Sequence, residues 1–239
     1  MADLRDAGTR PVVSAEAAKY ARLSGVLAVV FAVLMSLALI LVNRSPGFAA
    51  SDQSYDAFYA PGGKTVLITV GLYLIPFAGI AFLWHMITVR LLVRELAPDV
   101  PKMPMSLQVL AGGLFVALLW VGTAAAGAVA LVVDIGTGPV PGPDVGRALS
   151  GIGYAVVFVY AVRAAGMYVM TTTTLLMKAA LLPRWLGLLS YVLALAMLIA
   201  TTFNPAVLLV LPGWAVLVGV IVLVRAGRPG ARAIPEAAS

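Results

Sequence analysis

Arg163 is the residue whose position most strongly suggests chemistry. It lies 15 residues before Lys178 and 16 after Arg147, near the middle of a long apolar segment. A cation at that depth in a membrane costs about 2.5 kcal/mol or more, so it usually faces a partner or a hydrated cavity. At 100° per residue its helix face also carries Tyr160, Met167, Met170, Thr174 and Lys178, with Thr171 at the edge.

Two interpretations of this polar stripe stay open. In the first, Arg163 binds an anion or a carboxylate, or forms one wall of a permeation path. In the second, it is structural, and it pairs with carbonyls or hydroxyls of a neighbouring helix or extends toward the membrane surface. No carboxylate lies at mid-membrane depth, and the nearest acidic residue, Asp134, ends a different apolar segment.

His85 and the threonines from 171 to 174 are the other polar residues with chemical potential. A lone histidine can carry protons or sense pH, but it can also lie at the membrane interface beside an anchoring tryptophan such as Trp84. Threonine hydroxyls can line a pore or join helices. They can equally donate to a carbonyl one turn earlier in their own helix.

The sequence lacks the residues that most enzymes need. It has no cysteine, and it contains no P-loop, dinucleotide-binding fingerprint, HExxH or GxSxG motif. It has no pair of mid-membrane carboxylates for acid–base catalysis. We therefore predict a protein that is not an enzyme and holds neither a cofactor nor a metal.

Composition predicts that these residues lie in a bundle of membrane helices. The 239 residues are 62% hydrophobic and 11% charged, too few charges to cover a water-facing surface. A membrane span needs about 20 mainly apolar residues. Six segments qualify, and they are residues 23–42, 65–89, 106–133, 148–177, 185–201 and 205–224. We expect the first to be an uncleaved span, because it is longer than the apolar part of a signal peptide.

The basic residues predict the orientation of this all-α bundle. Twelve lysines and arginines fall on one side of the six spans and three on the other, so both termini are predicted to be cytoplasmic. The expected organisation is a cytoplasmic segment at 1–22, a transmembrane domain at 23–225 and a disordered tail at 226–239. Because the positive charges mark helix ends, they do not indicate nucleic-acid binding. We expect loops at 43–64 and 134–144.

Three further features bear on helix packing. Pro76 and the pair Pro212-Gly213 are helix breakers inside predicted spans, where kinks can border binding sites. Gly122 and Ala126 form a small-residue face on the third span, which predicts close helix packing within the chain or between chains. Packing between chains would make the protein a homo-oligomer or a subunit of a larger membrane complex.

Several stretches resemble a group of bacterial six-span membrane proteins with no assigned activity. The resemblance covers about 60–70% of the chain, and it lies in residues 72–84, 170–174 and 182–187 and in Pro212-Gly213-Trp214. It implies the same topology and a multi-pass protein of the bacterial cytoplasmic (inner) membrane. It implies no activity.

Two functions are therefore expected. The first, slightly favoured by Arg163, is a small transporter or channel-like protein for a small or anionic solute. Its path would involve Arg163, Tyr160, Met167, Thr171, Thr174 and His85. The second is a non-catalytic accessory or scaffold protein of a larger membrane complex. Short loops and few intramembrane polar groups favour it.

Overall fold

The computed structural model describes residues 14–42, 45–60, 65–136, 138–199 and 203–226. Within these ranges the chain is helical and contains no strand. The helices are α1 (Ala15–Val42), α2 (Asp52–Tyr59), α3 (Thr65–Leu96), α4 (Lys102–Ile135), α5 (Pro143–Tyr154), the π-helix η1 (Ala155–Ala161), α6 (Val162–Lys178), α7 (Arg184–Ile199), the 3₁₀-helix η2 (Pro205–Leu209) and α8 (Val210–Ala226).

Among the described residues, five helical stretches are long and apolar enough to cross a membrane, which indicates a multi-pass membrane protein. They are Ala15–Val42, Ile68–Leu96, Lys102–Ile135, Pro143–Lys178 and Pro205–Arg225. They correspond to five of the six predicted spans. The remaining one forms α7, whose 16 residues reach about 24 Å along the axis, less than a full hydrocarbon core.

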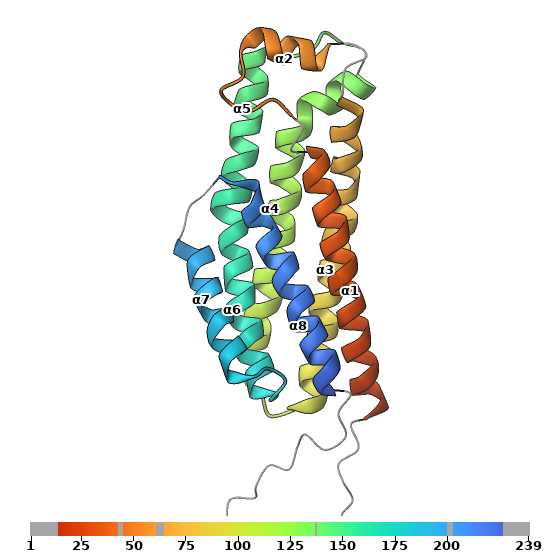
Figure 1. The fold of residues 1–239 in the computed structure, drawn as a ribbon, viewed down its shortest axis with the longest axis vertical. Coiled ribbons are helices and arrows are strands. Elements are labelled where there is room, and N and C mark those ends of the chain that lie inside the picture. Colours follow the sequence, from red (N-terminus) through yellow and green to blue (C-terminus); the bar gives the residue numbers. More distant parts are fainter. Residues whose placement is uncertain (1–13, 43–44, 61–64, 137, 200–202, 227–239) are drawn as a thin grey trace, which may run out of the picture.

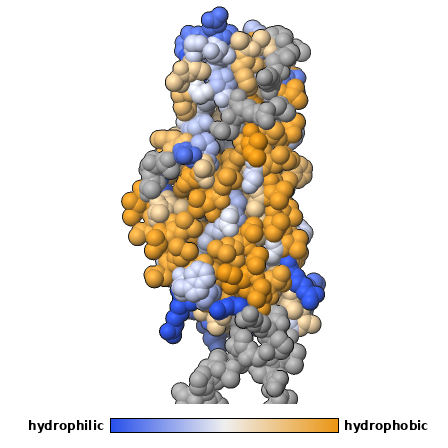
Figure 2. Space-filling model, in the orientation of Figure 1, coloured by the Kyte–Doolittle hydropathy of each residue, from blue (hydrophilic) through white to orange (hydrophobic). Residues whose placement is uncertain are grey.

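The long helices stand side by side in an elongated bundle (Figure 1). α1 packs against α3 and α8, α4 packs against α3 and α6, and α7 packs against α6. The start of α1 and the end of α8 lie at the same end of the bundle, and α2 lies across the opposite end. Apolar side chains cover the middle of the face seen in Figure 2, and hydrophilic ones gather toward its two ends.

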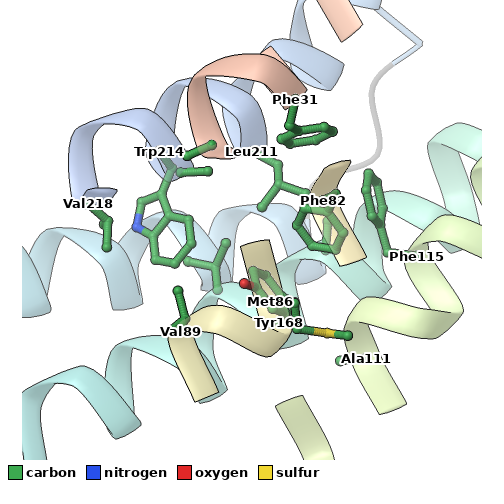
Figure 3. Close-up of a cluster of buried hydrophobic side chains, with 14 of the residues drawn as sticks. Phe31, Phe82, Met86, Val89, Ala111, Phe115, Tyr168, Leu211, Trp214 and Val218 are labelled. Atoms are coloured by element: carbon green, nitrogen blue, oxygen red, sulfur yellow. The ribbon is translucent and has the colours of Figure 1, made fainter. Parts of the chain in front are cut away.

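Aromatic side chains fill the centre of the bundle (Figure 3). The Phe82 ring lies 5.0 Å from Phe31, 5.2 Å from Phe115 and 4.8 Å from Tyr168, measured between ring centroids. Tyr168 in turn meets Trp214 of α8 at 6.2 Å. These residues come from α1, α3, α4, α6 and α8, so one cluster joins the five helices.

The predicted small-residue face of Gly122 and Ala126 is used within the chain. A Cβ atom on Gly122 would come within 2.5 Å of Val157 in η1. On the opposing helix, a Cβ atom on Gly153 would come within 2.7 Å of Ala126. α4 and the α5–η1 segment therefore touch along their backbones here, and assembly with another chain stays a prediction.

A small folded unit occupies the α2 end of the bundle, and it includes much of the segment 43–64 that was expected to be a loop. We call it the cap; it comprises residues 45–60, 65–69, 129–136 and 143–150. Ser51 begins α2 as its N-cap, because its side chain accepts a hydrogen bond from the Ser54 N–H. Tyr55 and Tyr59 are buried against Ile68, Val129 and Ala130, which form a separate apolar core.

One helix start and two prolines differ from what the sequence analysis expected. α1 begins at Ala15, inside the segment 1–22 that was predicted to precede the bundle. α3 runs unbroken through Pro76. Pro212 falls in the first turn of α8, where a missing N–H costs no helical hydrogen bond. The predicted disordered tail, apart from its first residue Ala226, lies outside the described residues.

Candidate functional site

Arg163 lies in the first turn of α6, directly after the π-helix η1. The side chain is partly buried, and its Nη1 donates a hydrogen bond to the Val159 carbonyl at 2.5 Å. Side chains on a helix lean toward its N-terminus, so the guanidinium sits about one turn closer to the cap than its own Cα. π-helices are rare and often occur at functional sites, which makes this junction notable.

The other residues of the predicted stripe do not share one environment. Tyr160 is exposed and Met167 is partly buried, whereas Thr171 is buried and donates to the Met167 and Tyr168 carbonyls. Thr174 bonds to the Met170 carbonyl and to the Tyr191 hydroxyl of α7 at 2.9 Å. The two threonine hydroxyls are therefore used in helix-backbone and interhelical bonds.

His85 lies apart from this stripe, on α3. It is buried, and its Nδ1 is 2.9 Å from the Ser24 carbonyl of α1. A carbonyl can only accept, so Nδ1 must carry the proton. His85 thus joins α1 to α3 in the part of the chain that the structure describes.

A buried polar cluster that the sequence analysis missed links α4 and α6. Gln108 Nε2 donates to the Thr172 hydroxyl at 3.1 Å, and both side chains are almost fully buried. Gln108 Oε1 and the buried Tyr168 hydroxyl have no hydrogen-bond partner among the described residues. Gln108 lies only two residues inside the predicted third span, so the sequence suggested a residue at the span boundary and not a buried one.

A pocket lies between the cap and the aromatic cluster. Its cavity volume is about 70 Å³. Helices α1, α3, α4, α5, η1 and η2 and the segment 45–48 contribute its lining, which includes Ser45, Phe48, Thr123, Ser150, Tyr154 and Phe158. Within the described ranges, neither a charged side chain nor any member of the Arg163 stripe lines it. Two apolar grooves of about 330 and 230 Å³ lie between α3 and α4 and between α7 and α8.

Arg147 is the electrostatic centre of the cap. Its guanidinium donates to the Ala50 carbonyl at 2.8 Å and to Asp52 at 2.6 Å, and it lies 3.6 Å from Asp144. It also lies 5.7 Å from the centroid of the Tyr55 ring. These contacts tie α2 to α5.

Asp134 joins the ends of α3 and α4 within the cap. Its carboxylate accepts hydrogen bonds from the hydroxyls of Thr65, at 2.5 Å, and Thr69. Thr65 is the first residue of α3, where a helix dipole favours negative charge. Asp134, the acidic residue nearest to Arg163 in the sequence analysis, therefore bonds to Thr65 and Thr69.

The cap tyrosines should ionise unusually late. Burial raises the pKa of both Tyr55 and Tyr59 above the ordinary value of about 10. Below about pH 10 both phenols are protonated in the folded and the unfolded protein, and the stability that comes from burying them is fully present. It is lost as pH rises further, because the unfolded cap releases its phenolic protons first. The ultraviolet titration difference between wild type and Tyr59→Phe should have its midpoint above pH 10; a midpoint at or below 10 would show that Tyr59 is accessible to water.

Among the described residues, no group of three histidine or carboxylate side chains comes close enough to hold a metal ion. The arrangement shows a closed aromatic centre, one small uncharged pocket and a polar cap. No protein-family model, curated protein or solved structure matches this chain.

Proposed function

We propose that this protein is a non-catalytic accessory subunit of a larger complex in the bacterial inner membrane. The observation that carries the proposal is the closed interior. Rings of Phe31, Phe82, Phe115, Tyr168 and Trp214 occupy the centre of the bundle, where a solute path would run. A folded cap at one end offers a polar surface outside the membrane.

In this proposal the chain crosses the membrane six times, with both termini in the cytoplasm. α6 ends near the end of the bundle where α8 also ends, so α7 has to carry the chain back toward the cap (Figure 1). The excess of lysine and arginine at that end supports a cytoplasmic location. The cap then faces the outside.

This orientation also accounts for Arg163. The Val159 carbonyl that it contacts is 19 residues before Lys178, about 28 Å along the helix axis. That is close to the full thickness of the hydrocarbon core, so the guanidinium reaches the outer interface although its Cα lies deeper. The structural interpretation of Arg163 is thereby favoured over an anion site at mid-membrane.

Partner contact is proposed at surfaces other than Gly122 and Ala126. Gly122 and Ala126 pack closely against Val157 and Gly153 of the same chain, which favours a partner site elsewhere. The exposed polar surface of the cap and the lipid-facing helices stay available to a partner.

Transport of a small or anionic solute is the second function. It is favoured by one observation, the partly buried Arg163 directly beside a π-helix. In that case the aromatic cluster would be a closed gate, and the helix would change register when it opens.

Flux measurements on purified protein in liposomes separate the two functions. We expect chloride-sensitive dye and osmotic-swelling assays to show no flux above protein-free liposomes. Arg163→Ala should lower the thermal unfolding midpoint by roughly 2–4 °C, because it removes a carbonyl contact. The exposed Arg184→Ala is the control and should leave that midpoint unchanged. Flux in wild type that Arg163→Ala abolishes, and Arg184→Ala does not, would establish transport instead.

A further inference from the structure

The pocket below the cap has a lining that selects for uncharged molecules. The residues of its lining that the structure describes include no lysine, arginine, histidine, aspartate or glutamate. An ion moved into such surroundings would lose its hydration without gaining a charged partner, which is strongly unfavourable. Salts and charged metabolites are thereby poor occupants.

The hydroxyl groups of the lining define the polar part of an occupant. Ser45 donates its proton to the Val42 carbonyl, and Thr123 donates to the carbonyls of Leu119 and Trp120. Their oxygens are left able only to accept a hydrogen bond. An occupant that bonds to them must therefore bring a donor.

Ser150 adds a group that can both donate and accept. It is partly exposed, and none of the hydrogen bonds found among the described residues involves its side chain. It stands on α5 three residues before Gly153, at the pocket wall. The pocket wall thus offers two acceptor oxygens, on Ser45 and Thr123, and one hydroxyl, on Ser150, that can both donate and accept.

Aromatic side chains line another wall of the pocket, which can pack against the apolar part of an occupant. Phe48 and Tyr154 meet edge to face at 4.9 Å, and Tyr154 and Phe158 lie 5.2 Å apart. The pocket has a volume of about 70 Å³ and opens to the molecular surface, so a short apolar chain can extend along this wall from a bound hydroxyl.

From these features we propose that the pocket binds a small uncharged alcohol, which places its hydroxyl among Ser45, Thr123 and Ser150. The apolar part of the alcohol lies against Phe48, Tyr154 and Phe158. Because the pocket does not include Arg163, this binding is independent of whether the protein is an accessory subunit or a transporter.

Two isomeric probes test the role of the hydroxyl. 1-Butanol and methyl propyl ether have the same atoms, but only the alcohol can donate a hydrogen bond. Saturation-transfer NMR on the full chain in nanodiscs should show binding of 1-butanol that is at least about fivefold stronger than that of the ether, since one hydrogen bond is worth about that much. Equal binding of the two isomers would overturn the proposal.

Variants of Ser150 locate the site. Ser150→Val should lower 1-butanol binding about fivefold by removing one hydrogen bond, and Ser150→Phe should abolish it by filling the cavity. Ser106→Val, an exposed position at the far end of α4, is the matched control and should bind like wild type. Thermal unfolding of each variant checks that it is folded. Unchanged binding in folded Ser150→Val and Ser150→Phe would place the alcohol in the surrounding lipid and refute the pocket.

Discussion

Gly153→Ala is expected to lower the free energy of unfolding by about 2–3 kcal/mol, measured by denaturation in detergent micelles. The added methyl group would lie 2.5 Å from the Gly122 carbonyl oxygen and 2.7 Å from the Ala126 backbone nitrogen. These are backbone atoms of a packed helix, so neither can move aside without separating α4 from α5.

Gly151→Ala is the matched control for this prediction. It lies two residues away on the same helix, and its methyl group would meet nothing within 4 Å. Because alanine is the better helix former, this variant should be as stable as wild type or slightly more stable. If both variants were equally stable, α4 and α5 would not be in backbone contact.

Phe82→Ala should cost about 3 kcal/mol of stability, the lower end of the range for aromatic residues in soluble cores. Phe82 is fully buried, and its ring contacts Phe31, Phe115 and Tyr168. When a membrane helix separates from the bundle, its side chains meet lipid and not water. Most of the lost stability therefore comes from lost packing contacts, and the hydrophobic transfer of the Phe82 ring contributes less than it would in a soluble protein.

The control for Phe82 lies five residues earlier on α3. Phe77 is 60% exposed, and its ring faces the proposed lipid, so Phe77→Ala should change the unfolding free energy by less than about 0.5 kcal/mol. A similar loss for both variants would mean that the aromatic cluster does not hold the bundle together.

The apolar helices were predictable from sequence, because length and hydropathy alone decide whether a segment can cross a membrane. Five of the six predicted segments are confirmed as helices long and apolar enough to span. The cap was not predictable in the same way. α2 has only eight residues, and it is held by Arg147, which lies 95 positions from its partner Asp52.

The polar interior shows the same limit. The expectation that threonines can bond within their own helix is confirmed for Thr171 and Thr174. The partner of Gln108 lies on a different helix, 64 positions away, and no local pattern reveals it. The sequence analysis also did not anticipate the π-helix before Arg163, where Val157 lies against Gly122 of α4.

The most direct test of the proposed orientation uses the absence of cysteine from the chain. Single cysteines would be placed at Asp56 in the cap, at Glu16 in the first turn of α1 and at Asp99 between α3 and α4, all exposed positions. A membrane-impermeant maleimide on intact cells should label Asp56→Cys, whereas Glu16→Cys and Asp99→Cys should react only after the membrane is opened. Labelling of Glu16→Cys or Asp99→Cys on intact cells, with Asp56→Cys protected, would contradict the proposed orientation.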